Sequence, residues 1–568
     1  MESAPPLLPE PARPGPMEWA GLGFALLVAL AFRAHVDNSP FPFHTFERTD
    51  EVHYVSRSVG FLNGEWDVTY FKNPSLYMYV LYAGSLVAGI GLVVTGRYDS
   101  LADFVRAASA DPYAVTIAGR VISILAGVAG VAVLWLVARR LYSHLVAFVG
   151  ALALAVDRTH ASRCMLAGNE ALMTLLVLLF LLVLLRHVRR PTAGSHAVCG
   201  LLLGLAVSTK YNAAVHVVTL LAATLVVAAA ARDSPVRREL QRTRAWVGFL
   251  CVPLGFVTGS PCAAVNFGSF LAGFSRQASL LHEFWSEENA AQTSAFQTYV
   301  LGFPEANCGL VFALLCLAGI VAALVRASSR RDVRSILMVS AVVPVFLYLG
   351  RGSFHLMRFL LPAIPFVLLL GAWAYVSLVS WSVERLDTRN AGSVRPAVCV
   401  LGALAVLGPG AAPTYRALWR EFGRPDARAE LLHWMRDNLD PEKRYLKFVY
   451  PAQSNLLDQP RASRAPGRPL RATSLASLLS ASATFEGLLA ELGSGRWDGL
   501  VVSIPGRIRD PRQHPEDLAQ RLRAFDRKRF RALARCEYWD RACEHLARLE
   551  CMGFGRGGGA WVAVLKLP

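Results

Sequence analysis

Apolar segments close to the length of a membrane crossing recur along residues 18–412, and short arginine-rich segments separate them. Hydrophobic residues make up 54% of the 568-residue chain, and charged residues make up only 17%. A water-soluble protein of this length needs far more polar surface to cover its core. The pattern therefore predicts a polytopic α-helical membrane protein with about 11–13 spans.

The predicted spans lie near residues 18–35, 113–138, 144–157, 168–186, 197–209, 212–231, 245–265, 307–326, 335–350, 357–380 and 396–412. Several are shorter than the ~20 residues of a straight crossing, which indicates tilted or broken helices. Arginine-rich connections fall at 139–140, 186–190, 232–244, 326–334 and 384–395. Two spans separate each connection from the next, so these connections share one side, which the positive-inside rule makes cytoplasmic. The loops at 158–167, 266–306 and 351–356, and everything after about residue 413, then lie outside.

Residues 76–95 do not fit this alternation. The segment is apolar enough to span the membrane, but a crossing there would place residues 36–75 on the cytoplasmic side, opposite the 158–167 loop. Either this helix lies in the interface or re-enters, or the N-terminus is outside. The first interpretation is preferred, because the chemistry considered below needs both loops on one face.

The charge distribution and the cysteine spacing argue against a nucleic-acid-binding protein and against a zinc site. The net charge of +17 lies mainly in short loops beside apolar spans, which indicates membrane topology and anionic headgroups rather than nucleic-acid binding. Residues 1–17 form a proline-rich tail without a basic start, so the first apolar stretch is interpreted as an uncleaved anchor. Cys536, Cys543 and Cys551 lie in the polar C-terminal region, where the pairing of any two stays open. No Cys/His spacing typical of a zinc site occurs.

The chain changes character after residue 413, and residues 413–568 are predicted to form an extracytoplasmic, water-soluble α/β domain. The pattern predicts an amphipathic helix over Arg428–Asn438, strands over Tyr445–Tyr450, Leu500–Ile504 and Trp561–Leu567, a loop over 458–473 and a charged helical stretch over Arg512–Leu549. Acceptor binding is a hypothesis for this domain that rests only on its predicted side.

The first external loop, residues 36–75, contains the most informative residues. Val52, Val55, Val59 and Leu62 recur at helical spacing, which predicts a membrane-lying helix over 51–63 that ends at Asn63-Gly64. Asp50 is a candidate N-cap of this helix, and it is equally a candidate catalytic carboxylate. The two roles are compatible.

Charge favours a catalytic role for this loop. Asp50 and Glu51 are adjacent acids at the mouth of an apolar bundle, and Lys72 follows about twenty residues later. Sugar transfer from a phosphate-linked donor needs a carboxylate to take the acceptor's proton, and cations to offset charge on the leaving phosphate. An interfacial lysine that extends toward lipid headgroups is the alternative interpretation of Lys72.

Four motifs together resemble the superfamily C (GT-C) glycosyltransferases, in particular the protein O-mannosyltransferases and the bacterial lipid A aminoarabinose transferases. The first loop carries Asp50-Glu51-Val52-His53-Tyr54, Gly64-Glu65-Trp66 and Lys72-Asn73-Pro74. Downstream lie Ser162-Arg163 with Asn169-Glu170-Ala171-Leu172, Gly204-Leu205-Ala206 with Thr209-Lys210-Tyr211, and Arg358-Phe359-Leu360-Leu361-Pro362. The chain has Glu170 where the family usually has Asp, and Phe359 where it has Tyr. The resemblance covers about residues 18–412.

The resemblance implies a role for each matched residue. Asp50 would be the catalytic carboxylate, and Glu51 would support it. Lys72 would bind the carrier phosphate, Arg358 would assist it, and Glu170 would complete an acidic face opposite Asp50. Asp50, Glu51 and Lys72 would meet in one pocket just outside the lipid.

Several of these residues have simpler alternative roles. Asp50, Glu51 and Glu170 are also candidate ligands of a divalent metal ion. Glu170 is equally a helix N-terminal acid favoured by the helix dipole. His53 is as readily solvated as substrate-binding. Lys210 and the adjacent Tyr211 are assigned to the membrane interface.

The resulting hypothesis is a multi-pass glycosyltransferase of the inner or plasma membrane, inverting and metal-optional. It would move a sugar from a polyprenyl-phosphate donor to an acceptor hydroxyl on protein, lipid or polysaccharide, at the extracytoplasmic face. The 266–306 loop would cover the acceptor or the sugar. A membrane transporter and a non-catalytic scaffold of the same fold are the alternatives. The clustering of acids in loops at one face, rather than at mid-span, favours the enzyme over the transporter.

Overall fold

The computed structural model describes two compact units. Its described residues are 12–34, 49–66, 71–230, 235–283, 295–307, 309–351, 356–386 and 391–422, then 444–448, 471–474, 485–492, 499–505, 515–523, 546–549, 551–557 and 560–566, with a few isolated positions. The first unit comprises Met1–Val36, Asp50–Leu101 and Ala114–Gly423, and the second comprises Asp37–Thr49, Ala102–Tyr113 and Arg424–Pro568.

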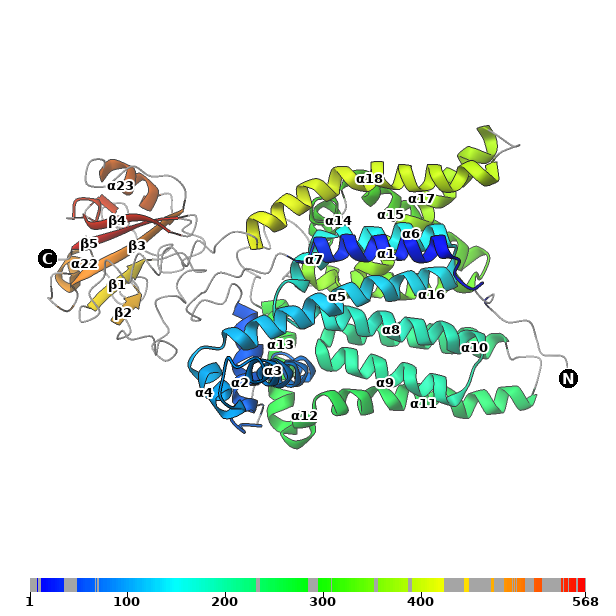
Figure 1. The fold of residues 1–568 in the computed structure, drawn as a ribbon, viewed down its shortest axis with the longest axis horizontal. Helices are drawn as coiled ribbons and strands as arrows, with labels where there is room; N and C mark the ends of the chain where they lie inside the picture. The colour runs from blue at the N-terminus through cyan, green and yellow to red at the C-terminus, as the bar shows by residue number, and fades with distance from the viewer. Residues whose placement is uncertain are drawn as a thin grey trace. The chain divides into compact units, whose positions relative to one another are not determined.

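A bundle of helices with roughly aligned axes forms the main part of the first unit (Figure 1). These helices are α1 (Pro16–Ala31), α5 (Tyr113–Leu141), α6 (His144–Val156), α8 (Glu170–Arg189), α9 (Ala193–Thr209), α10 (Val217–Ala230), α11 (Pro235–Gly259), α15 (Leu310–Ser329), α16 (Val333–Gly350), α17 (Ile364–Leu386) and α18 (Ala391–Phe422). Each predicted span overlaps one of them. Helix α6 is the central helix, with residues Leu145–Val156 almost entirely buried against α1, α17 and α18.

Within the described residues, eight helices are long and apolar enough to cross a membrane, or nine if the bent pair of α6 and α7 (Arg158–Cys164) is one span. Three shorter apolar helices, Pro16–Ala31, Ala193–Thr209 and Trp246–Gly259, add to these. The short lengths agree with the tilted or broken crossings expected from the sequence. The predicted fold class, a polytopic helical membrane protein, is confirmed.

Helix α3 (Leu76–Val94) is one of the eight by length and composition. Figure 1 nevertheless shows it nearly end-on, whereas the bundle helices lie in the plane of the view. Helix α3 therefore runs across the bundle direction, as an interfacial or re-entrant helix does. This agrees with the preferred interpretation of residues 76–95. Helix α2 (Thr49–Leu62) confirms the helix predicted over 51–63, and Gly64 ends it with a positive φ of 82°.

Two predicted loops contain helices. Residues 158–164 of the 158–167 loop form α7, because Asp157 accepts a hydrogen bond from the backbone of His160 and caps a new helical turn. The 266–306 loop holds α13 (Phe267–Glu283) and α14 (Ala295–Ala306), both apolar on one face. These external segments form helices because amphipathic segments gain more by packing an apolar face than by staying irregular.

The two ends of the bundle differ in charge. The last turns of α5, α8, α15 and α17 carry arginines, and these turns lie together at the right-hand end in Figure 1. Helices α2, α3, α7, α12 (Pro261–Val265) and α13 gather at the opposite end. The predicted alternation of arginine-rich connections and site loops is therefore present in the fold.

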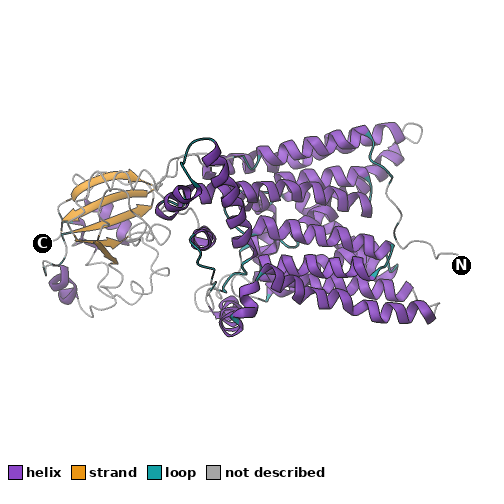
Figure 2. Cartoon of the chain, turned by 60° about the horizontal axis from the view of Figure 1, so that its bottom comes forward, coloured by secondary structure: helices purple, strands orange, loops and turns teal. Residues whose placement is uncertain are grey.

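The second unit contains a mixed five-stranded sheet of order β2-β1-β3-β5-β4. Its strands are β1 (Arg444–Phe448), β2 (Arg471–Ser474), β3 (Gly499–Pro505), β4 (Cys551–Gly557) and β5 (Ala560–Lys566), coloured orange in Figure 2. Strand β1 pairs parallel to β2 and β3, and β5 pairs antiparallel to β3 and β4. Helices α4 (Leu101–Ala110), α22 (Phe485–Leu492) and α23 (Pro515–Arg523) belong to the same unit.

The predicted α/β character of the C-terminal region is confirmed by this sheet and its helices. Strand β2 replaces the end of the loop predicted over 458–473, because pairing with β1 satisfies its backbone. The helix predicted over Arg428–Asn438 lies outside the described residues, and α18 continues past residue 412 to Phe422.

Glycines bring α9 and α11 into backbone contact. A Cβ atom at Gly204 would collide with the carbonyl oxygen of Val252, and a Cβ atom at Gly255 would collide with that of Leu201. Close approach through small residues is typical of helix pairs in membranes, where packing rather than the hydrophobic effect drives association.

We expect Gly204→Ala to lower the free energy of unfolding by about 1–3 kcal/mol, because the added methyl group must push α11 away. Thermal unfolding in detergent measures this loss. Gly23→Ala in α1 is the matched control, since no atom lies within 4 Å of its added Cβ. Equal stability of the two variants would contradict the tight α9–α11 contact.

Candidate functional site

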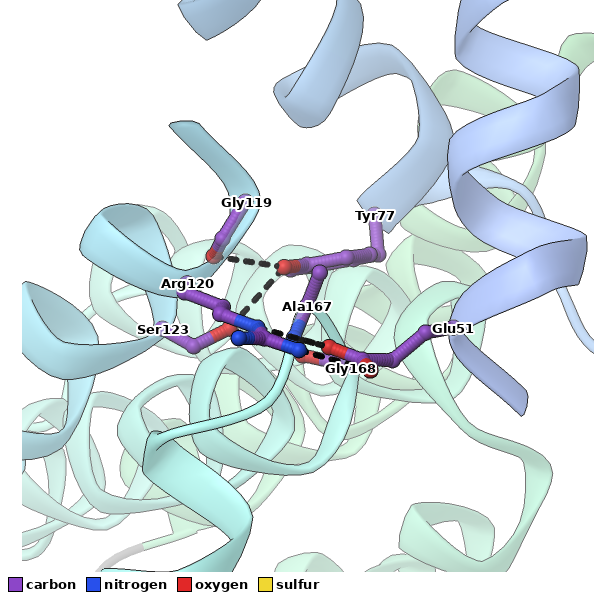
Figure 3. Close-up of polar contacts among 7 residues, drawn as sticks. All are labelled: Glu51, Tyr77, Gly119, Arg120, Ser123, Ala167 and Gly168. Atoms are coloured by element: carbon purple, nitrogen blue, oxygen red, sulfur yellow. Dashed lines mark hydrogen bonds and ion pairs between the residues drawn. The ribbon is translucent and has the colours of Figure 1, made fainter. Parts of the chain in front are cut away.

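Glu51 is a buried carboxylate at the start of α2, with only 1% of its surface exposed. Its Oε1 accepts hydrogen bonds from Arg120 Nε (3.2 Å) and from the backbone N–H of Ala167 (2.8 Å), and its Oε2 accepts one from Arg120 Nη2 (3.3 Å). Figure 3 shows both partners at the carboxylate end of the Glu51 side chain. The carboxylate therefore joins three segments: α2, α5 and the turn between α7 and α8.

One face of α5 is shaped to receive that turn. A Cβ atom at Gly119 would lie 2.7 Å from the Cβ of Ala167, so the glycine permits the close approach. One helical turn later, the Ser123 hydroxyl donates to the carbonyl oxygen of Gly168 at 3.2 Å. The Tyr77 hydroxyl, from α3, lies 2.9 Å from Ser123 and donates to the carbonyl of Gly119. These contacts, drawn in Figure 3, fix α3 and the 165–169 segment on α5.

Glu170 is a second buried acid, and it begins α8 directly after that turn. Lys210 Nζ lies 2.8 Å from its Oε1, and the side chains are only 14% and 7% exposed, respectively. Arg163 and Arg358 also act electrostatically on this carboxylate. The ammonium of Lys210 and the guanidinium of Arg358 lie 5.7 and 5.8 Å from the centre of the Phe359 ring. A positively charged cluster thus surrounds Glu170.

The segment that carries Lys72 is held by its neighbours. The Tyr211 hydroxyl donates to the carbonyl oxygen of Phe71 at 2.9 Å, and a Cβ at Gly273 of α13 would lie 2.8 Å from the Phe71 side chain. The backbone N–H of Ser75 donates to the Ser260 hydroxyl at 3.0 Å. The Lys72 side chain is exposed. In the described part of the chain, no ion pair joins it to Glu51 or Glu170.

The structure brings together only some of the residues predicted for the site. Glu51 and Glu170 flank the same turn, and Arg358 is near Glu170. His53 lies half-buried in α2. Asp50 lies in the first turn of α2, and its side chain is outside the described residues, so its predicted role stays a prediction.

Lys210 and Tyr211, assigned to the membrane interface from the sequence, have specific partners in the fold. Lys210 pairs with a buried acid, and the Tyr211 hydroxyl bonds to the backbone beside Lys72. A buried carboxylate in a low-dielectric surrounding requires a neutralising partner, and this requirement decides the location of the lysine.

Arg120 is a site residue that none of the sequence motifs contains. This arginine stands within the apolar helix α5, where a charge is costly unless it is paired. An isolated arginine in an otherwise apolar span is a signal for a buried acidic partner. Sequence spacing alone does not identify that partner, because Glu51 is far away along the chain.

No group of three or more His, Cys, Asp or Glu side chains that could hold a metal ion occurs among the described positions. Glu51 and Glu170 are each already neutralised by a base. The cation considered from the sequence, which also involves Asp50, stays a prediction.

We expect Arg120→Met to destabilise the protein by about 3–5 kcal/mol, because it leaves the Glu51 carboxylate buried without its counter-ion. Adding Glu51→Gln should restore part of this loss. Thermal unfolding in detergent measures both changes, with Arg97→Met at an exposed position after α3 as the control. A single Arg120→Met variant as stable as the control would contradict the buried pair.

Comparisons with known proteins concern the fold and the family. A family model described as dolichyl-phosphate-mannose-protein mannosyltransferase matches residues 114–258, a range that contains Arg120, Glu170 and Lys210. No curated protein sequence matches this chain significantly.

Two solved structures are similar to this chain at low identity. The archaeal oligosaccharyltransferase AglB from Archaeoglobus fulgidus, in complex with an inhibitory peptide and a dolichol-phosphate, is 12% identical with a TM-score of 0.51, over 86% of this chain and 69% of that one. ArnT from Cupriavidus metallidurans, in the apo state, is 16% identical with a TM-score of 0.48, over 96% of this chain and 98% of that one. The family model matches only residues 114–258 of the chain, and the likeness to AglB shows a shared fold. The predicted resemblance to the GT-C glycosyltransferases is thereby confirmed.

Proposed function

We propose that this chain transfers a sugar from a polyprenyl-phosphate donor to an acceptor hydroxyl at the extracytoplasmic face of the membrane. Asp50 is the catalytic carboxylate in this proposal. The observation that carries it is the buried Glu51 carboxylate, bonded to Arg120 and to the backbone N–H of Ala167. These bonds hold the first turn of α2, and with it the backbone of Asp50, at the end of the bundle where the positively charged cluster lies.

The basic residues at this end suit a phosphate. Lys72 is exposed, and Arg358 lies half-buried beside Phe359. Cations positioned at a leaving phosphate stabilise the charge that develops there. Arginine at the opposite helix ends supports the proposed side, because positively charged connections favour the cytoplasm and leave the site outside.

The proposed reaction is a single displacement. Asp50 takes the proton from the acceptor hydroxyl as its oxygen attacks the anomeric carbon, and the bond from that carbon to the phosphate oxygen breaks. The electron pair of that bond leaves with the polyprenyl phosphate. Lys72 and Arg358 offset the added negative charge. The configuration at the anomeric carbon is inverted.

Glu51 has a positioning role in this scheme. Both of its carboxylate oxygens accept hydrogen bonds from Arg120, and Oε1 also accepts one from Ala167. Glu51 therefore fixes α2 rather than exchanging protons with substrate. Glu170 is held by Lys210 in the same way. The proton-accepting role is therefore assigned to Asp50.

We expect Asp50→Asn to lower the turnover number by ~10²–10⁴-fold, the usual effect of removing a general base. The measurement is sugar transfer from a polyprenyl-phosphate donor by purified protein in lipid nanodiscs. Asp99→Asn, an exposed carboxylate after α3, is the matched control and should keep full activity. Full activity of Asp50→Asn would remove the base role. Mass spectrometry of glycans, lipids and glycopeptides from cells with and without the chain would identify the acceptor.

We expect Lys72→Gln to raise the KM for the donor by about 10–100-fold, because a charge-assisted hydrogen bond to phosphate contributes ~1.5–3 kcal/mol. Lys72→Arg retains the charge and should recover most of the affinity. Initial rates at varied donor concentration measure the effect. An unchanged donor KM in Lys72→Gln would place the phosphate elsewhere.

A further inference from the structure

Arg33 is fully buried just after the end of α1, and its guanidinium makes four hydrogen bonds inside the first unit. Nη1 donates to the carbonyl oxygens of Ala29 (2.9 Å) and Ala155 (2.8 Å). Nη2 donates to the carbonyl oxygen of Leu154 (3.1 Å) and to His160 Nδ1 (2.7 Å). A buried arginine in a membrane protein is costly unless its donors are used, and here backbone carbonyls and an imidazole use the donors on Nη1 and Nη2, whereas Nε has no hydrogen-bond partner.

Its acceptors flank the break between α6 and α7, where the chain bends by 59°. The last carbonyls of a helix lack partners within the helix, and Arg33 supplies donors for those of Leu154 and Ala155. On the other side of the break, Asp157 Oδ1 accepts the backbone N–H of His160 at 2.7 Å. The two side chains thus satisfy both helix ends that the bend creates.

The chemistry of the contact fixes the state of His160. An arginine has only donors, so His160 Nδ1 must be the acceptor. The ring is therefore neutral, with its proton on Nε2, which lies 3.8 Å from the Sγ of Cys164. The Arg33 charge also acts electrostatically on the Asp157 carboxyl group.

Helix α7 connects this break to the candidate site. Cys164, its last residue, packs so closely on α5 that a Cβ at Gly127 would collide with its Sγ atom. Three residues later, the Ala167 N–H donates to Glu51. Arg163, also in the last turn of α7, acts electrostatically on Glu170. The position of α7 thus sets the backbone donor of one site acid and a positive charge at the other.

We propose that Arg33 is a positioning residue of the candidate site. By holding the carbonyl end of α6 and the ring of His160, it fixes the bend, and through residues 164–167 it sets the hydrogen bond from Ala167 to Glu51. The catalytic consequence rests on the proposed function, but the structural consequence does not. Lysine cannot replace Arg33, because one ammonium cannot serve acceptors on two sides of a break as a planar guanidinium does.

Hydrogen exchange tests the structural part. In Arg33→Lys we expect the amide of Ala167 to exchange at least about tenfold faster than in the unsubstituted protein, because a loosened bend opens its bond to Glu51. Arg139→Lys is the matched control: Arg139 is 9% exposed, pairs with Glu18 at 2.8 Å and lies at the other end of α5. In Arg139→Lys the hydrogen-exchange rate of the Ala167 amide should stay unchanged. Equal exchange at Ala167 in both variants would overturn the proposal.

A double-mutant cycle tests the catalytic part. Arg33→Lys should lower the turnover number by about tenfold with the donor KM unchanged, and this effect should largely vanish when Glu51→Gln is already present. Simple addition of the two effects would show that Arg33 does not act through Glu51. If the unsubstituted protein transfers no sugar from polyprenyl-phosphate donors, the proposed function fails while hydrogen exchange still decides the role of Arg33. Should Arg33→Lys fail to fold, His160→Phe, which removes only the acceptor, undergoes both measurements with the same criteria.

Discussion

The buried ion pair of Glu51 and Arg120 is the interaction on which the arrangement of the site depends. Removing two charges from water is expensive, and the expense is offset only when geometry and further hydrogen bonds are favourable. The Ala167 N–H supplies that further bond. Since the pair joins α2, α5 and the turn before α8, breaking it would release the first loop from the bundle. Its value lies in specifying one arrangement more than in net stability.

Glu170, Lys210 and Arg33 show the same requirement that a buried charge needs a partner. Lys210 neutralises Glu170, and the carbonyl oxygens at the end of α6 accept hydrogen bonds from Arg33. Glu51, Glu170 and Arg33 therefore each have a partner that is distant in sequence. In a membrane such charges are retained where they line a functional cavity or hold irregular backbone, and this end of the bundle combines a bent helix with a tight turn.

Glycines allow the helix backbones to approach closely enough for these hydrogen bonds to form. Gly119 and Gly127 lie on one side of α5, and each allows the α7–α8 segment to approach closer than any side chain would permit. Gly204 and Gly255 do the same between α9 and α11. Close packing and buried polar bonds thus support each other: the glycines bring the backbones together, and the hydrogen bonds fix their register.

The sequence by itself determined the helical membrane class, the positions of the spans and the helix over 51–63, because hydropathy and 3.6-residue periodicity are local properties. It also selected Glu51 and Glu170. Only the tertiary structure decided their partners, Arg120 and Lys210, and placed helices in two predicted loops. Charge pairing between segments far apart along the chain depends on how the helices pack, and no local pattern encodes that packing. The bend held by Arg33 is the clearest case, since Arg33 follows α1 and its acceptors lie in three helices, α1, α6 and α7.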